Sequence, residues 1–265
     1  MIGSAERAHA ARRTVIEAAI AARTAHIGSS LSIVDVLAVL YTDVLREDDH
    51  FLLSKGHAAS ALYATLAAAG RLEHDDVVRG YCSDGGAFAG HPERGVAGIQ
   101  MTGGSLGHGP SIAVGTALAD RHDGNGRRTF CLVGDGELNE GSVWEALALG
   151  GHLALGNLTL IVDANGLQGL GTTGAVLDLE PLLPKLRAFG WRATEVDGHD
   201  HHALRDALGA TRAGPHAIVA RTIKGYGVSS MENALMSHYK PLSEDQRTPV
   251  LAELDALHER RKATA

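Results

Sequence analysis

Cysteine is scarce in this chain of 265 residues, where only Cys82 and Cys131 occur. Two isolated cysteines exclude a disulfide framework and a cysteine-based zinc site. The chain also lacks an apolar run of about 18 residues, and its polar start lacks the apolar stretch of a signal peptide. We therefore expect no membrane span and a location in the reducing cytoplasm.

Clusters of basic residues are missing as well. The chain carries 24 Lys and Arg against 31 Asp and Glu, which gives a net charge of −7. A nucleic-acid partner or an anionic membrane surface is therefore not expected. Apolar residues make up 45% of the chain and charged residues 21%, a composition that is typical of a soluble globular protein.

Glycine and histidine are abundant instead, with 33 and 15 residues, and many of them adjoin one another. Glycine permits tight turns and close backbone approach, whereas histidine transfers protons near neutral pH. The stretch 80–109 is rich in both residue types and shows little periodicity. Loops of this length without regular structure tend to be functional.

Short apolar segments alternate with helical patterns along the chain. We expect a short apolar run at 51–53 and strands at 129–133, 158–162, 192–196 and 217–221. We expect helices at 5–24, 33–45, 142–153, 180–189 and 201–212, an Ala-rich helix that ends near residue 69, and a polar tail helix at about 243–262. This alternation predicts an α/β fold, with a doubly wound and mostly parallel sheet between two layers of helices, in a single domain over residues 1–265.

Polar residues flanked by glycine follow two of the expected strands. Asp135 lies between Gly134 and Gly136 after the first strand, and Asn165 follows the next one. Since one strand-helix-strand unit separates them, both side chains can converge at the carboxyl edge of the sheet, where ligands bind in open α/β folds. Carboxylate, amide and carbonyl oxygens suit Mg²⁺ or Ca²⁺ rather than zinc. A tight turn or a helix cap would also explain Asp135, so the local pattern alone leaves the metal site open.

A wider set of motifs supports the metal interpretation. The segment GDGELNEG at 134–141 and the later DAN at 163–165 resemble the thiamine-diphosphate motif, in the form carried by the transketolase family. Other segments are similar to that family's motifs in the same order along the chain: AHIGSSLS at 25–32, LSKGH at 53–57, GHPE at 90–93, TGGSLGHG at 102–109, KGYG at 224–227 and SHY at 237–239. The resemblance runs from about residue 10 to 242 and implies a thiamine-diphosphate-binding fold.

The resemblance assigns roles to individual residues. It implies that Mg²⁺, for which Ca²⁺ or Mn²⁺ is expected to substitute, binds to Asp135, Asn165 and the backbone carbonyl of Leu167. It implies that the residues in contact with the cofactor are Gly134, Asp135, Gly136, Glu137, Asn165, Leu167, His57, Gly104, Ser105, Leu106, Lys224 and His238. It implies that the catalytic residues are His26, His57, His91 and His238, and that a subunit contact includes Glu140 and Glu145.

Members of this family transfer a two-carbon ketol unit from a ketose to an aldose, free or phosphorylated, and the cofactor serves as electron sink. Full-length members also carry a pyrimidine-binding domain, for which this chain leaves no segment. The resemblance therefore implies a partner, the C-terminal transketolase subunit with the pyrimidine-binding domain, and an α2β2 heterotetramer. The identity of the two sugars stays open.

Other functions remain as alternatives. A deoxyxylulose-phosphate synthase or a keto-acid dehydrogenase component uses the same cofactor, but Asn139-Glu140-Gly141 and the Ser-Lys-Gly-His segment favour transketolase. A nucleotide-binding oxidoreductase is a weak alternative, because no G-x-G-x-x-G follows an early strand. A non-catalytic subunit that only binds its partner is the third.

One histidine-rich string falls outside these motifs. His199, His201 and His202 flank Asp200 at the start of an expected helix, a pattern that invites a metal-binding interpretation. We expect them instead to be solvated or to cap the helix.

Overall fold

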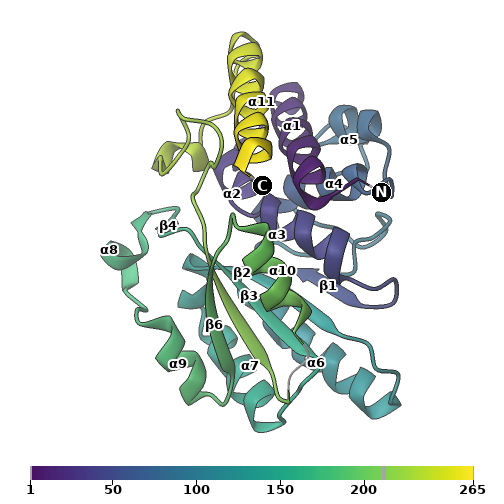
Figure 1. The fold of residues 1–265 in the computed structure, drawn as a ribbon, viewed down its shortest axis with the longest axis vertical. Helices are drawn as coiled ribbons and strands as arrows, with labels where there is room; N and C mark the ends of the chain where they lie inside the picture. Colours follow the sequence, from purple (N-terminus) through teal and green to yellow (C-terminus); the bar gives the residue numbers. More distant parts are fainter. Residues whose placement is uncertain (1, 211–212, 265) are drawn as a thin grey trace.

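A five-stranded parallel sheet forms the centre of the computed structural model, which describes residues 2–210 and 213–264 (Figure 1). The strand order is β1-β2-β3-β7-β6, and each neighbouring pair is parallel. The strands span His50–Leu53 (β1), Thr129–Gly134 (β2), Leu158–Ala164 (β3), Arg192–Asp197 (β6) and His216–Arg221 (β7). The prediction of a mostly parallel α/β sheet is confirmed.

Helices cover both faces of this sheet. Successive side chains of a strand point to opposite faces, so Phe130 and Leu132 of β2 join one buried apolar cluster, and Cys131 and Val133 join the other. The first cluster includes residues of α1 (Ser4–Ala22), α3 (Val34–Val39), α4 (Ala59–Ala68) and α10 (His201–Gly209). The second includes residues of α6 (His108–Asp123), α7 (Gly141–His152) and α9 (Leu182–Ala188).

Most of the remaining elements are short. They are the helices α2 (Ile27–Leu31), α5 (His74–Gly80) and α8 (Thr173–Leu177), the antiparallel pair β4 (Leu167–Gln168) and β5 (Gly171–Thr172), and the 3-10 turns η2 (Gly56–Ala58), η3 (Gly136–Asn139), η4 (Leu235–His238) and η5 (Glu244–Gln246). The long C-terminal helix α11 (Arg247–Thr264) packs beside α1, as Figure 1 shows. None of the helices described is both long and apolar enough to cross a membrane.

Several expected elements differ from the structure. The helix expected over 33–45 is divided, because α3 ends at Val39 and a π-helical turn, η1 (Leu40–Val44), follows it. The helix expected over 201–212 ends at Gly209, and residues 211–212 lie outside the described residues. Periodicity did not predict α2, α5 and α6. Helix α6 begins with His-Gly-Pro, which is a weak helix signal, but packing against β2 and α7 stabilises it. The stretch 80–109 was expected to be irregular, and residues 82–107 are so apart from isolated bridges, whereas Gly80 ends α5 and residues 108–109 begin α6.

Candidate functional site

A cavity of about 300 Å³ lies at the carboxyl ends of β2 and β3. The two strand ends adjoin, because Gly134 pairs with Asp163 and the N–H of Asp135 donates to the Asp163 carbonyl (3.1 Å). The cavity is lined by His26, Ser29, Lys55, His57, His91, Gly104, Leu106, Gly134, Asp135, Gly136, Glu137, Asn165, Leu167, Gln168, Gly169, Lys224 and His238. Most residues that the motifs selected therefore meet in one place, although they come from distant parts of the chain.

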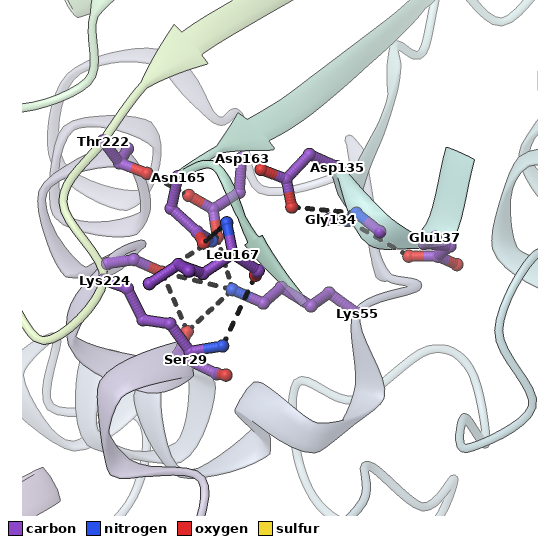
Figure 2. A network of polar contacts seen from close by, with 12 residues as sticks. Ser29, Lys55, Gly134, Asp135, Glu137, Asp163, Asn165, Leu167, Thr222 and Lys224 are labelled. Atoms are coloured by element: carbon purple, nitrogen blue, oxygen red, sulfur yellow. Dashed lines mark hydrogen bonds and ion pairs between the residues drawn. The ribbon is translucent and has the colours of Figure 1, made fainter. Parts of the chain in front are cut away.

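Oxygen donors from the two strand ends converge on this cavity (Figure 2). Asp135 Oδ1 accepts a hydrogen bond from the N–H of Gly136 (2.8 Å), and Oδ2 accepts one from the N–H of Gly166 (2.6 Å). Since Gly166 follows Asn165, the Asp135 carboxylate reaches across to the neighbouring strand end. Asn165 Oδ1 accepts from the N–H of Leu167 (3.1 Å). Each of these side-chain oxygens retains a lone pair that could bind a cation.

A buried ion pair between Lys55 and Asp163 supports these donors from within the protein. Lys55 Nζ also donates to the Ser29 carbonyl (2.9 Å) and to Ser32 Oγ (3.1 Å), so all three ammonium protons are used. Asp163 Oδ2 in turn accepts a hydrogen bond from Asn165 Nδ2 (2.9 Å). This bond fixes which end of the Asn165 amide is oxygen and which is nitrogen.

The two neighbouring carboxyl groups have pKa values shifted in opposite directions. Burial, reinforced by the charge of Asp163, raises the pKa of Asp135 to about 6. Burial also acts to raise the pKa of Asp163, but the adjacent Lys55 ammonium, together with hydrogen bonds from Thr222 and Ser32, outweighs it, and the pKa of Asp163 is lowered. Lys55 thus neutralises Asp163, and a divalent cation would supply the charge that stabilises ionised Asp135.

Three imidazoles form a cluster in the same cavity. The ring centroids of His26 and His238 lie 4.7 Å apart, those of His57 and His238 5.4 Å apart, and those of His26 and His57 5.5 Å apart. The backbone N–H of His26 donates to the backbone carbonyl of His238 (3.1 Å). The backbone of His26 adopts a left-handed conformation with φ of 64°. Non-glycine residues in that conformation are strained and cluster at functional sites.

The cluster is held in its uncharged form. Burial and then the charge of Lys224 lower the pKa of His238 to about 4. Burial and the nearby Lys55 lower the pKa of His57 well below its usual value, and burial also lowers the pKa of His26. Burial, followed by the charge of Lys55, lowers the pKa of Lys224 to about 8. Lys224 Nζ lies 3.3 Å from His238 Nδ1, so the neutral imidazole can accept its proton in a hydrogen bond.

Two glycines are required for close approach of the backbone. A Cβ at Gly136 would lie 2.7 Å from the Cβ of Gln168, and a Cβ at Gly56 would lie 2.9 Å from the backbone nitrogen of Gly104. Gly104 itself has φ of 142°, which side chains rarely adopt. These contacts let the loops after β1, β2 and β3 close around the cavity.

Glu137, for which a cofactor contact was predicted, lies in the cavity wall and joins the surrounding loops. Its Oε1 accepts hydrogen bonds from Ser54 Oγ and from the N–H of Gly107 (2.8 Å), and its Oε2 accepts one from the N–H of Gly134 (3.2 Å). With 2% of its surface exposed, the carboxylate is committed to these three donors. We infer that Glu137 holds together the segments that carry Ser54, Gly107 and Gly134, in addition to any contact with a cofactor.

The remaining predicted residues divide between the cavity and the surface. Gly104 and Leu106 line the cavity, whereas Ser105 is not among its lining residues. His91 lines the cavity and is itself exposed, which places it at the rim. Glu140 and Glu145 lie outside the cavity, at the start of α7, and both are exposed.

Several residues of the site had no role predicted from the sequence. Lys55 and Asp163 stand within the selected motifs, but nothing in the local pattern indicated that they pair with each other across 108 positions. Ser29 and Gln168 also line the cavity. The one available signal was Asp163, a charged residue near the end of an otherwise apolar strand, because a buried charge is normally paired.

The expectation for His199 and His201 was wrong. Their side chains are only 9% and 10% exposed, and both donate to the fully buried carboxylate of Asp35, at 2.8 Å and 2.7 Å. His202 is exposed, as expected, and Asp200 caps α10 by accepting from the N–H groups of His202 and Ala203. The error arose because Asp35 is distant in sequence from the string that it binds.

The sheet order, the strand-end oxygen donors and the glycine-lined cavity together define a thiamine-diphosphate-binding α/β domain. Residues 4–254 match the sequence family described as "Transketolase, thiamine diphosphate binding domain". The chain therefore belongs to the transketolase family, and the resemblance inferred from the motifs is confirmed.

Relatives of two lengths are similar to this chain. One of the subunits of the apulose-4-phosphate transketolase of Phocaeicola vulgatus is 36% identical over 255 residues, which cover 92% of this chain and 90% of the relative. The 6-deoxy-6-sulfo-D-fructose transketolase subunit SqwG of a Clostridium species is 39% identical over 245 residues, 87% of this chain and 88% of the relative. The solved transketolase of Leishmania mexicana superposes on 99% of this chain with a TM-score of 0.82 and 30% identity, but only 46% of that longer chain is covered.

Proposed function

We propose that this chain is the diphosphate-binding subunit of a two-chain transketolase, which uses thiamine diphosphate and Mg²⁺ to transfer a two-carbon ketol unit from a ketose to an aldose. One observation carries the proposal: Asp135, Asn165 and Leu167 line the same cavity as the imidazoles of His57 and His238. The residues that we propose as metal ligands and as proton-transfer groups thus share one concave site, as an enzyme of this family requires.

The residues present fit a hard divalent cation. Asp135, Asn165 and the Leu167 carbonyl would offer Mg²⁺ an all-oxygen set, and Ca²⁺ or Mn²⁺ would suit the same donors. The raised pKa of Asp135 indicates that its charge is poorly compensated within the chain. Lys224, whose Nζ lies 3.4 Å from the Leu167 carbonyl, would add a cation near the diphosphate.

Thiamine diphosphate, when bound, supplies the electron sink for cleavage of the carbon–carbon bond of the ketose. The side chains of this subunit would orient the sugar and move protons. His26, His57 and His238 have lowered pKa values, so they are neutral near pH 7 and can accept protons or hydrogen bonds from sugar hydroxyls. We assign the proton shuttle to His238 and contact with the donor sugar to His26 and His91, which lies at the rim.

We further propose that a C-terminal subunit supplies the pyrimidine-binding domain. Two similar chains of nearly the same length are named as subunits of transketolases, and the chain covers under half of the solved transketolase. Two copies of each subunit, related by a twofold axis, would form an α2β2 heterotetramer. The exposed Glu140 and Glu145 are candidates for the contact.

Two free cysteines, Cys82 and Cys131, favour a reducing cytoplasm.

The sugar pair is the least determined part of the proposal. The names of the two similar subunits refer to apulose 4-phosphate and to 6-deoxy-6-sulfo-D-fructose. We propose a ketose or ketose phosphate as donor and an aldose or aldose phosphate as acceptor. Because the two names point to different sugars, the test requires a panel that includes both phosphorylated and free donors.

Co-purification with the product of the adjacent open reading frame tests the function. The mixed chains should transfer ketol units in a reaction that needs thiamine diphosphate and is abolished by chelation of divalent cations, and each chain alone should be inactive. Mixed chains that bind thiamine diphosphate but transfer nothing from any donor would favour the non-catalytic alternative. Activity of this chain alone would contradict the two-chain proposal.

Charge reversal at the subunit contact tests the assembly. Glu145→Arg should shift the mixed chains toward smaller species in light scattering, because the longer side chain with the opposite charge no longer matches a partner surface that accommodates Glu145. Glu73→Arg, an exposed change at the start of α5, serves as the matched control and should leave the assembly unchanged. Equal behaviour of both variants would remove Glu145 from the contact.

A further inference from the structure

His199 joins the buried core to the segment 222–226, of which Lys224 lines the cavity. It lies in the loop between β6 and α10, and its Nδ1 is 2.8 Å from Asp35 Oδ2. On the other side of the ring, the backbone N–H of Ile223 donates to His199 Nε2 (2.9 Å). The imidazole also stacks on Tyr226, with ring centroids 3.6 Å apart and planes inclined by 17°. His199 therefore contacts the segment 222–226 twice.

The hydrogen bonds determine the tautomer of this histidine. A backbone N–H can only donate, so His199 Nε2 must carry a lone pair toward Ile223. The proton therefore lies on Nδ1 and is donated to Asp35, as in other pairs in which a carboxylate orients a histidine. The ring is neutral and has a defined orientation.

The Asp35 carboxylate, which accepts the hydrogen bond from His199, is itself held by several other side chains. Its carboxylate is fully buried and also binds Arg12 (2.5 Å), His201 (2.7 Å) and Arg261 (3.0 Å), which belong to α1, α10 and α11. Burial alone would raise the pKa of Asp35, but Arg12 and the two histidines hold it well below its usual range. The acceptor for His199 is thus ionised near neutral pH and is held by three further side chains.

The segment that His199 holds carries one residue that lines the cavity, Lys224, and one that binds the buried Asp163, Thr222. Thr222 Oγ1 donates to Asp163 Oδ1, and Lys224 Nζ lies near His238 Nδ1 and the Leu167 carbonyl. Ile223, the residue bound to His199, lies between them. Lys224 is only 1% exposed, so the position of its ammonium depends closely on the position of its backbone.

We propose that His199 is a positioning residue that fixes the 222–226 segment, so that Lys224 presents its ammonium to the diphosphate beside the Leu167 carbonyl. The role of Lys224 at the diphosphate rests on the proposed function. The contacts of His199 with Asp35 and Ile223 do not depend on it. His199 is not among the residues that line the cavity, and it acts through Ile223 and Lys224.

Three variants of the full chain, mixed with the partner subunit, test this role by calorimetric titration of thiamine diphosphate in the presence of Mg²⁺. His199→Leu removes both hydrogen bonds and should weaken binding by roughly tenfold, within the range for residues that orient a metal site. His199→Gln retains an acceptor for the Ile223 N–H and should bind within about twofold of the wild type. His202→Leu, on the exposed side of the same helix start, is the control and should bind as the wild type does.

A second background separates positioning from general destabilisation. In Lys224→Met, the further change His199→Leu should weaken binding by less than about twofold, because the group through which it acts is already absent. A full tenfold loss in that background would overturn the proposal. Unchanged binding in His199→Leu alone would also overturn it.

Hydrogen exchange in the free chain keeps the two proposals distinguishable. His199→Leu, but not His202→Leu, should accelerate exchange of the amides in 222–227, since the Ile223 N–H loses its acceptor. If thiamine diphosphate fails to bind even to the wild-type pair while this exchange result holds, the proposed function fails and the positioning of the segment by His199 stands. Unchanged exchange in His199→Leu would refute the positioning itself.

Discussion

Lys55 and Asp163 form an ion pair that is almost completely shielded from water, with 2% of Lys55 and none of Asp163 exposed. The lysine follows β1 and the aspartate lies near the end of β3, so the pair spans the edge of the sheet beneath the cavity. Asp163 also accepts the amide N–H of Asn165 (2.9 Å). The orientation of a predicted metal ligand therefore depends on a lysine that does not bind the metal.

Removal of the lysine should be strongly destabilising. Lys55→Met leaves the Asp163 carboxylate buried without its cationic partner, and we expect the free energy of unfolding in urea to fall by about 3–5 kcal/mol. Lys55→Met combined with Asp163→Asn should recover part of that loss, because no unpaired charge remains. The exposed Lys240→Met is the control. A Lys55→Met chain as stable as the control would show that the pair is unimportant for folding.

The imidazole cluster predicts a loss of stability in acid. The pKa of His238 is about 4 in the folded chain because of burial and the charge of Lys224, against roughly 6.5 when unfolded. Its contribution to stability is therefore fully present above about pH 6.5 and is lost as the pH falls toward about 4. His57 and His26, whose pKa values are also lowered, act in the same direction.

Melting temperatures measured across this pH range test the effect. His238→Gln should show a shallower decline than the wild type, because one group that must be protonated in the unfolded chain is gone. Met236→Gln, an exposed change in the same turn, should follow the wild-type curve. Parallel curves for His238→Gln and the wild type would show that His238 does not titrate with the shifted pKa.

The raised pKa of Asp135 predicts that its carboxylate lowers the stability of the metal-free chain near pH 7, although we expect cofactor binding to need it. Its pKa rises from 3.8 to about 6 on folding, so its favourable contribution is present below about pH 3.8 and is lost as the pH rises through about 6. At about pH 7 without metal, Asp135→Asn should therefore stabilise the chain by roughly 1–2 kcal/mol in urea unfolding. The same variant should gain nothing from added Mg²⁺ and thiamine diphosphate. Lower stability than the wild type in chelator would contradict the shifted pKa.

The strands and the strand-end donors were predictable from the sequence because both depend on local patterns. Short apolar runs identify β2 and β3, and parallel pairing brings the residues that follow them to one edge. In this way Asp135 and Asn165 could be related from the sequence alone. The order of the motifs then identified the family, which no single segment could do.

Long-range pairing was not predictable in the same way. Lys55 binds Asp163, and His199 binds Asp35, over separations of 108 and 164 residues. A local window holds only one partner of each pair, so it gave no role to Lys55 and indicated a solvated or capping residue at His199. Helix α6 was missed for a related reason, since its stability depends on packing against β2 and α7 rather than on helix propensity.

Calorimetric titration of thiamine diphosphate into the mixed subunits, with Mg²⁺ and then with chelator, tests the central claim most directly. The account predicts tight binding that needs the cation, and a loss of at least about 100-fold in Asp135→Ala, while the exposed Asp84→Ala binds as the wild type does. Binding that persists without a divalent cation, or that is equal in Asp135→Ala and Asp84→Ala, would contradict the account.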